Sequence, residues 1–164
     1  MNSSKLFFVH LAVSIIPDTR LWGLKRRLYR WAGANVGKNV RICSSAKITG
    51  TSGLKLGDNV WIGHDVLIVC SAPVVIGNDV NIAPRVYIGT GTHKIEPNGQ
   101  SIAGEGESFP IVIGPGSWLC AGVMLLPGTK IGNMSIIAAG SVVKGEVPSF
   151  QLWGGSLAHF IKNL

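Results

Sequence analysis

The stretch LGDNVWIGHDVLI, residues 56–68, carries an aliphatic residue at every sixth position. The same spacing recurs between residues 36 and 143 and fills fifteen positions: Val36, Ile42, Ile48, Leu56, Ile62, Ile68, Ile76, Ile82, Ile88, Ile113, Leu119, Leu125, Ile131, Ile137 and Val143. A strict six-residue period would wander around an α-helix, but it is a multiple of the two-residue strand period. The repeat therefore predicts strands whose aliphatic side chains point inward, and it excludes helical and doubly wound folds for residues 36–147.

Turn residues and short insertions group these repeats in threes. Residues 57–59 read Gly-Asp-Asn and residues 77–79 read Gly-Asn-Asp, which are turn-forming sequences, and two extra residues follow Ile48 and Ile68. Fifteen repeats at three per triangular coil predict five coils. Stacked at the strand spacing of about 4.8 Å, they form a prism about 24 Å tall.

One interval breaks the period. Ile88 and Ile113 are 25 residues apart, so a loop over residues 89–112 must leave the coil. The loop contains Thr-Gly-Thr-His at 90–93 and the acids Glu96, Glu105 and Glu107. Because long loops on rigid scaffolds usually carry function, we expect the active residues here.

The two ends of the chain lack the six-residue repeat that predicts the β-helical middle, residues 35–147. Residues 1–34 predict an N-terminal helical segment with helices at 4–16 and 20–32, divided at Pro17. The second helix places Leu21, Leu24, Leu28 and Trp31 on one face and its cations on the other. We expect both helices to cover the open edge of the first coil. The tail, residues 148–164, contains the apolar stretch Ala158–Ile161, which predicts a short C-terminal helix.

Composition and charge narrow the function classes. The chain has 164 residues, a net charge of +7, and only 14% charged against 46% hydrophobic residues, which excludes an intrinsically disordered protein. Ten of the fifteen Lys and Arg residues lie in residues 1–57, where Asp18 is the single acid. Three cysteines without CxxC spacing indicate neither a disulfide framework nor a zinc site. The apolar run 6–16 is too short to span a bilayer, so we expect a cytoplasmic protein.

Repeats of the form (Leu/Ile/Val)-Gly-x4, interrupted by one loop with a histidine, resemble the hexapeptide-repeat acyltransferases. Residues 76–84, the Thr-Gly-Thr-His motif at 90–93 and Ser-Phe-Pro-Ile at 108–111 are similar to the sugar O-acetyltransferase branch, which includes galactoside, maltose and colanic-acid-type enzymes. The resemblance covers about residues 36–162. It implies a left-handed parallel β-helix, a homotrimer with active sites between neighbouring prisms, and acetyl-CoA-dependent acetylation of a sugar hydroxyl in bacterial surface polysaccharide biosynthesis.

The resemblance also places the catalytic base at His93. Imidazole suits this role because its pKa lies near neutral pH. A general base usually needs a partner that orients its ring, and Glu105 aligns with an acid of the related loops; Glu96 and Glu107 are alternatives. Relatives of the maltose type have an asparagine near the acceptor where this chain has Gly63, which makes His64 or Asp65 a candidate substitute. Asn81 is a further acceptor candidate, although its position also suits a turn.

Acetyl-CoA, the implied donor substrate, is expected along the outside of the lower coils. Ala121, Ala139 and Gly140 are small enough to let its pantetheine arm approach the backbone. Trp118 aligns with a coenzyme-contacting tryptophan. Lys144 and Lys162 are candidates for the coenzyme's phosphates. Relatives often have Thr-Lys where this chain has Lys144 and Gly145, so the phosphate contacts are shifted or weaker. No metal is required.

Other interpretations remain open at this stage. One alternative is an acyltransferase with another acceptor: a serine, an amino sugar or an antibiotic. Another is a non-catalytic trimeric scaffold, which would show the same repeats. The γ-class carbonic anhydrases share the fold but need three histidines around zinc, whereas this chain offers His64 and His93 in the coil and His159 in a predicted terminal helix. Nucleic acid is disfavoured because the aromatics beside the cations suit an apolar helix face. That basic helix, next to the apolar 4–16 helix, either docks on the membrane surface or is a solvated cap.

Overall fold

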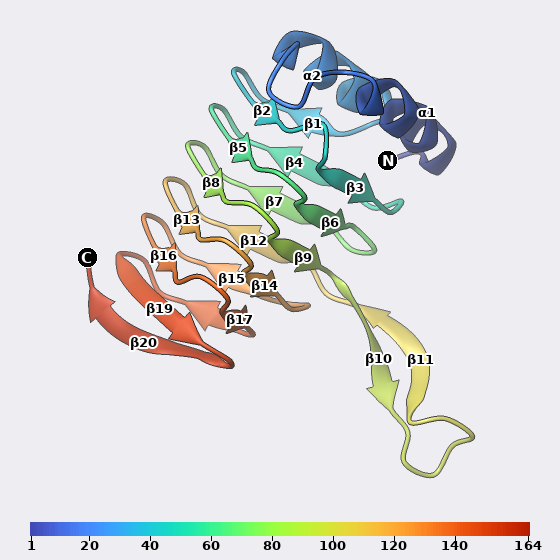
Figure 1. The fold of residues 1–164 in the computed structure, drawn as a ribbon. Coiled ribbons are helices and arrows are strands. Elements are labelled where there is room, and N and C mark those ends of the chain that lie inside the picture. Colours follow the sequence, from blue (N-terminus) through green and yellow to red (C-terminus); the bar gives the residue numbers. More distant parts are fainter.

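The computed structural model describes residues 1–164 and forms a triangular parallel β-helix with two helices at one end (Figure 1). The first wall, in spatial order, is β1 (Asn35–Val36), β4 (Leu54–Leu56), β7 (Val74–Ile76), β12 (Ile111–Ile113), β15 (Lys130–Ile131) and β18 (Glu146–Val147). The second is β2 (Arg41–Ile42), β5 (Trp61–Ile62), β8 (Asn81–Ile82), β13 (Trp118–Leu119), β16 (Ile136–Ile137), β19 (Gln151–Gly155) and β20 (Ala158–Asn163). The third is β3 (Lys47–Thr49), β6 (Leu67–Val69), β9 (Tyr87–Gly89), β14 (Met124–Leu125) and β17 (Val142–Val143).

The hydrophobic core is the axis of this prism. All fifteen aliphatic repeat positions are buried and belong to one cluster of 33 residues, as the six-residue period predicts. Successive coils stack in register, with Leu56 beside Ile76, Ile76 beside Ile113, and Ile113 beside Ile131. The corners must be narrow for this stacking, because a Cβ on Gly57 would overlap Asn78 of the next coil. Five complete coils are therefore confirmed, and β18 and β19 begin a sixth.

The two N-terminal helices are α1 (Ser3–Ser14) and α2 (Trp22–Trp31), and they cover the first coil as predicted (Figure 1). The predicted orientation of α2 is wrong. Lys25 and Tyr29 are its buried residues, whereas Leu24 and Trp31 are 44% and 51% exposed. Lys25 is tolerated inside because its ammonium donates a hydrogen bond to the Asp18 carbonyl at 2.6 Å and lies 4.7 Å from the Trp22 ring centroid.

The predicted C-terminal helix is also wrong. Residues 158–163 form β20, which pairs antiparallel with β19, so His159 lies in a strand and not in a helix. The physical reason is the exposed edge that the last coil leaves. An unpaired strand edge offers free N–H and C=O groups, and the returning tail hydrogen-bonds to β19 along its length.

The loop over residues 89–112 leaves the coil as predicted. Its hairpin, β10 (Gly91–Ile95) and β11 (Ala103–Ser108), projects from the body as an arm (Figure 1). Ile95 and Ile102 near its tip are 80% and 64% exposed. The arm therefore presents apolar side chains well away from the core of its own chain.

Candidate functional site

His93 lies where the arm leaves the coil. It lines an open hollow of about 760 Å³ together with Tyr87 of β9, Phe109 at the end of the arm, and Leu126 and Lys144 from the two coils below. The structure thus brings the predicted base and one predicted phosphate-binding lysine to the same hollow. Its lining combines aromatic and aliphatic side chains with several charged and polar ones, and such a mixture suits a small polar ligand.

The root of the arm is fixed by the hydroxyl of Thr90. This buried oxygen accepts hydrogen bonds from the backbone N–H groups of Ser71 (2.8 Å) and Ala72 (2.9 Å). It donates to the Val69 carbonyl at 3.0 Å. The Phe109 N–H donates to the Thr90 carbonyl at 2.9 Å, which joins the two ends of the arm. The first Thr of the Thr-Gly-Thr-His motif therefore anchors the chain before His93.

The acid expected to orient His93 is engaged elsewhere within the arm. The residue opposite His93 on β11 is Gly106, which has no side chain. Glu105 instead forms an ion pair with Lys94 at 2.6 Å, and both side chains are exposed. Of the three loop acids, Glu107 is the one that lines the hollow with His93. The orienting role of Glu105 stays a prediction.

Three of the six predicted coenzyme residues, Ala121, Ala139 and Gly140, share one corner of the prism, between the second and third walls. Ala121 follows β13 and Ala139 follows β16, and the Gly140 N–H donates to the Ala121 carbonyl at 2.9 Å. Gly140 has a positive φ of 69°, and a Cβ there would meet nothing within 4 Å, so this surface is open to a ligand. Trp118 lies on the adjoining wall, 48% exposed and in register with Asn81. Lys162 lies on β20, the last strand of the second wall, at the C-terminal end of the prism.

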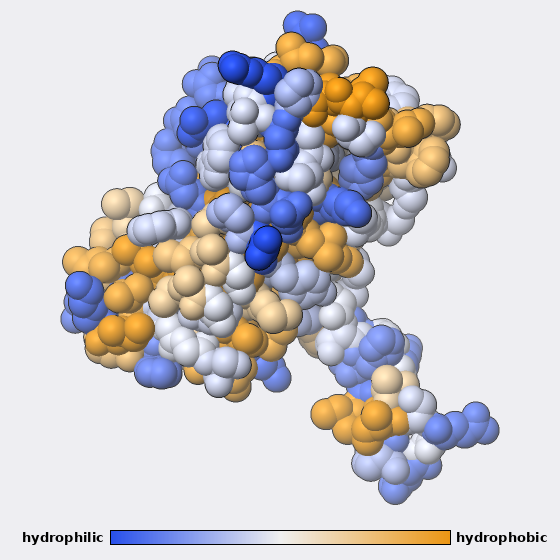
Figure 2. Space-filling model, in the orientation of Figure 1, coloured by the Kyte–Doolittle hydropathy of each residue, from blue (hydrophilic) through white to orange (hydrophobic).

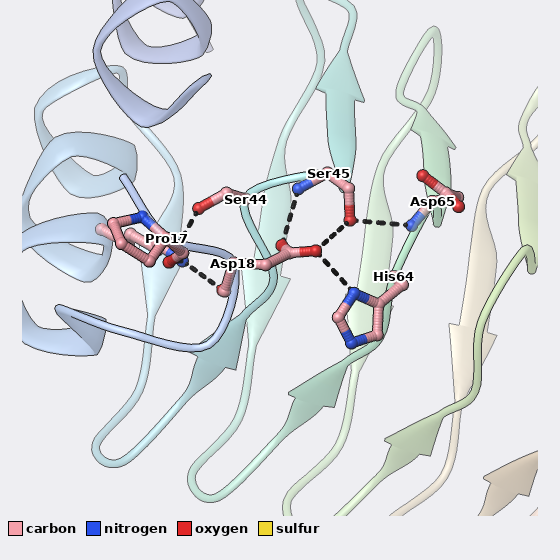
Figure 3. A network of polar contacts seen from close by, with 7 residues as sticks. Pro17, Asp18, Ser44, Ser45, His64 and Asp65 are labelled. Atoms are coloured by element: carbon pink, nitrogen blue, oxygen red, sulfur yellow. Dashed lines mark hydrogen bonds and ion pairs between the residues drawn. The ribbon is translucent and has the colours of Figure 1, made fainter. Parts of the chain in front are cut away.

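His64 occupies the same corner in the second coil and belongs to a polar network (Figure 3). Its Nδ1 lies 2.5 Å from Oδ2 of Asp18, a residue of the segment between α1 and α2. The Asp18 carboxylate also accepts the backbone N–H and the hydroxyl of Ser45, each at 2.9 Å. The Ser45 hydroxyl in turn accepts the N–H of Asp65 at 3.2 Å. His64 therefore contacts the Asp18 carboxylate directly, whereas Asp65 is linked to it only by its backbone N–H, through the Ser45 hydroxyl.

Electrostatics favour an ionised Asp18. Partial burial alone would raise the pKa of its carboxyl group, but the hydrogen bonds from Ser45 and His64 outweigh burial and hold the pKa below its usual value. Sequence reasoning did not select Asp18 as a site residue. The one available signal was its position as the single acid among the cations of residues 1–57.

Cys43 adjoins the same pair, and its sulfur lies within 4.8 Å of the Asp18 and His64 ligand atoms. This trio does not suit a metal ion well. Burial raises the pKa of the Cys43 thiol to about 11, which keeps the sulfur protonated. The buried Lys25 ammonium already brings a positive charge to Asp18, and it donates to that residue's carbonyl. The arrangement is that of a hydrogen-bonded histidine–aspartate pair.

Known proteins match this chain in sequence and in fold. The family described as "Bacterial transferase hexapeptide (six repeats)" matches residues 110–145. The protein named "Putative colanic acid biosynthesis acetyltransferase WcaF" from Escherichia coli is 35% identical over 142 residues, covering 82% of this chain and 76% of that protein. Galactoside O-acetyltransferase from the same organism is 34% identical over 131 residues, covering 80% and 64%.

Solved structures show the same fold. The hexapeptide-repeat-containing acetyltransferase VCA0836 from Vibrio cholerae superposes with a TM-score of 0.73 at 23% identity, covering 98% of this chain and 89% of that one. A galactoside acetyltransferase in complex with coenzyme A superposes with a TM-score of 0.69 at 22% identity, covering 98% and 80%.

Proposed function

Because this chain belongs to the hexapeptide-repeat acetyltransferase family, we propose that it transfers the acetyl group of acetyl-CoA to a sugar hydroxyl in the biosynthesis of a bacterial surface polysaccharide. The observation that carries the proposal is the position of His93, which is held at the edge of a hollow by the anchored root of the arm. The sugar acceptor is supported by relatives named for colanic acid biosynthesis and for galactosides.

The reaction needs a base, a stabilised oxyanion and two aligned substrates. His93 takes the proton of the acceptor hydroxyl as its oxygen attacks the thioester carbonyl, which forms a tetrahedral intermediate. Collapse of the intermediate releases coenzyme A as the thiolate, which His93 reprotonates. Lys144 lines the same hollow and offers a cation to the coenzyme's phosphates. The open corner at Ala121, Ala139 and Gly140 lies at the other edge of the third wall, so a pantetheine arm bound there would serve the His93 of a neighbouring copy.

The proposal is tested by ligand-dependent melting and by transfer assays. Acetyl-CoA at 100 times its dissociation constant stabilises a protein by about 2.7 kcal/mol, which raises the midpoint by several degrees. We expect this shift in the wild type and in His93→Ala, with transfer to glycosides retained only in the wild type. Absence of a shift at millimolar acetyl-CoA would contradict coenzyme binding. Full transfer by His93→Ala would remove His93 from the reaction.

The active unit is proposed to be a homotrimer. The arm exposes Ile95 and Ile102 at its tip, and neither side chain packs on its own chain's core. A neighbouring copy would cover these side chains and would bring further residues to His93, whose facing residue within the arm is a glycine. Sedimentation velocity is expected to give a trimer for the wild type, and Ile95→Ser with Ile102→Ser to shift it toward monomer. A wild-type monomer with full activity would refute this part of the proposal.

The N-terminal helices support a membrane-surface location for the enzyme. Apolar residues surround α1; Leu6, Val9 and Val13 pack inward, while Phe7, Phe8, Leu11 and Ile15 are 57–84% exposed. This apolar face is visible over α1 in Figure 2. The N-terminal part of the chain is also strongly basic, since residues 1–57 hold ten Lys and Arg and one acid. An apolar helix face among cations suits an anionic bilayer surface. No helix of the chain has the length and apolar character needed to cross a membrane.

Vesicle co-sedimentation tests this location. We expect the protein to pellet with vesicles of equal phosphatidylglycerol and phosphatidylcholine, but not with phosphatidylcholine alone, because the attraction is electrostatic. Phe7→Ser with Leu11→Ser should abolish pelleting, since both side chains are exposed and their loss spares the core. Leu157→Ser with Leu164→Ser is the matched control, because it removes similar exposed apolar surface outside both α1 and the arm. Equal pelleting of both double variants would contradict docking through α1.

A further inference from the structure

We propose that the groove between α1 and β3 binds an anionic phospholipid, whose headgroup phosphate lies between His10 and Lys47 and whose acyl chains lie along α1. The groove consists of two adjoining hollows of about 390 and 320 Å³, and His10 lines both of them. Ser14, Asp18 and Lys47 line the first hollow, and Phe7 lines the second. The inference rests on the membrane-surface location proposed above and names the lipid contact within it. No residue assigned to acetyl transfer lines either hollow.

The positive charge in the first hollow has no partner. Lys47 is exposed on β3, and its ammonium group forms neither a hydrogen bond nor an ion pair with any group of the chain. Burial lowers the pKa of the neighbouring His10, and the charge of Lys47 lowers it further. Tyr29 of α2, whose ring centroid is 6.5 Å from that of His10, is neutral because burial raises its pKa. An anion in this hollow would therefore meet an unneutralised cation.

The one carboxylate in the lining is already engaged. Asp18 accepts the backbone N–H and the hydroxyl of Ser45, and it pairs with His64 and not with Lys47 (Figure 3). These three contacts hold the carboxylate against the coil at one end of the hollow. The charge of Lys47 is left for a ligand.

His10 and Lys47 both offer free hydrogen-bond donors. The backbone N–H of Ile48 donates to Nε2 of His10 at 3.4 Å. A backbone N–H can only donate, so the proton of the neutral imidazole lies on Nδ1, and no group of the chain accepts it. The Lys47 ammonium carries three further donors. Phosphate oxygens accept hydrogen bonds from both kinds of donor, and the bond from the ammonium is charge-assisted.

The face of α1 beside the groove favours a lipid over a free phosphate. At about 100° per residue, His10 and Ser14 lie on one side of the helix, and Phe7, Leu11 and Ile15 follow on the next. These three apolar side chains are exposed. Phe7 also lines the second hollow, so the apolar row begins at the rim of the groove. A lipid headgroup in the groove would place its acyl chains on this row, which a free phosphate would leave in water.

The basic face of α2 is not equally available. Arg26 donates to the Val40 carbonyl at 3.1 Å. Arg30 donates to the Val36 carbonyl at 2.8 and 2.6 Å from its two nitrogens. These cations fasten α2 to the first coil, whereas Lys47 is free to bind a ligand. The specific contact is therefore expected at Lys47 and not at the arginines.

The experiment measures binding of a soluble lipid to the full chain by calorimetry. The probe is dihexanoylphosphatidylglycerol below its micelle concentration, and the comparison ligands are inorganic phosphate and the uncharged amphiphile monohexanoin. We expect the lipid to bind at least about tenfold more tightly than phosphate, because its chains cover apolar surface. Lys47→Gln and His10→Leu should each weaken lipid binding about tenfold, as the loss of one strong hydrogen bond implies. In a long-range ¹H–¹⁵N spectrum, the His10 Nδ1 resonance should move with the lipid and stay with monohexanoin.

Matched controls and separate outcomes keep the site apart from the membrane location. Lys55→Gln removes an exposed lysine from the first wall, and His159→Gln removes an exposed histidine from β20; both should keep the wild-type affinity. Equal lipid affinity in Lys47→Gln and Lys55→Gln overturns the inference, and so does phosphate binding as tight as that of the lipid. If vesicle pelleting still depends on Phe7 and Leu11 in that case, the membrane location stands. Neither pelleting nor lipid binding by the wild type overturns both.

Discussion

Replacing Thr90 with valine tests whether one hydroxyl holds the root of the arm. Valine has nearly the shape of threonine, so the packing is kept while the hydroxyl is lost. The Thr90 hydroxyl bonds the N–H groups of Ser71 and Ala72 and the carbonyl of Val69, over distances of 2.8–3.0 Å. In Thr90→Val both N–H groups lose their acceptor at a position where water has no access to the side chain, since Thr90 is 0% exposed.

The structure sets the size of the effect. A buried polar group left without a partner costs about 1–3 kcal/mol. The Ala72 amide lies in a buried bond and the Ser71 amide in a partly buried one. We therefore expect the free energy of unfolding to fall by about 2–4 kcal/mol. At about 2–4 °C per kcal/mol for a chain of this size, the midpoint should fall by about 4–16 °C. Because His93 follows three residues later, kcat should fall as well.

The assay is urea and thermal unfolding at one fixed protein concentration, since a midpoint of an oligomer depends on concentration. Thr90→Ser is the control, because it keeps the hydroxyl and loses only a methyl group. Amide exchange at Ser71 and Ala72 should quicken in Thr90→Val and stay slow in Thr90→Ser. A free energy for Thr90→Val within about 0.5 kcal/mol of Thr90→Ser would refute the reasoning.

Three further changes probe the corners, the thiols and the acid response. Gly77→Ala should destabilise the coil by about 1–3 kcal/mol in urea unfolding, because the new Cβ would lie 2.6 Å from the Pro115 nitrogen. Native Cys70 should resist iodoacetamide, since burial raises its thiol pKa to about 11, and half-buried Cys120 should react first by mass spectrometry. Ionised Asp18 has a lowered pKa, so its stabilisation is complete above the unfolded pKa of about 3.9 and is lost as the pH falls through the folded value. The melting temperature should therefore fall less between pH 7 and pH 2 in Asp18→Asn than in the wild type.

Each of these changes has a control. Gly53→Ala introduces a Cβ that meets nothing within 4 Å, so it should leave urea stability close to the wild type. Iodoacetamide labelling in urea should modify all three thiols equally, and equal labelling in the native state would contradict the burial argument. The exposed pair Lys130–Glu146 serves as the control for acid. Lys130 also lowers the pKa of Glu146, but an exposed ion pair contributes little, so Glu146→Gln should change the acid-induced loss of stability less than Asp18→Asn does.

The repeat could be predicted because each of its positions has a single physical requirement. A side chain on the axis must be aliphatic, and a corner must be narrow, so sequence alone located the walls and the arm. The ends could not be predicted in the same way. The face of α2 depended on Lys25 finding the Asp18 carbonyl, and the tail became a strand because β19 had an open edge. Lys25 and Asp18 are only seven residues apart, and β20 pairs with the strand just before it. Both contacts nevertheless join separate segments, which the periodicity within one element does not encode.

The candidate site shows the same division. His93 was predicted as the base because the motif around it, Thr-Gly-Thr-His, resembles that of the family, and its place on the arm follows from the broken period. Asp18 was missed because its partners, Ser45 and His64, lie 27 and 46 residues away, and nothing near it in the sequence marks a contact. Glu105 was chosen by alignment, but the register of the arm pairs it with Lys94.

Equivalent corners of the coil explain how one scaffold holds different chemistry. In successive coils the corner between the second and third walls places Asp65, Arg85, Gly122 and Gly140 in the same left-handed conformation, with φ between 56° and 70°. Glycine adopts this conformation without strain, whereas other residues do so at a cost. The two lower coils keep glycine and leave the corner bare, which suits a coenzyme lying against the backbone. The second and third coils place Asp65 and Arg85 in this conformation, at a cost in backbone strain. The stacked backbone therefore repeats one corner geometry, and the residue at each corner decides whether the backbone there is covered or bare.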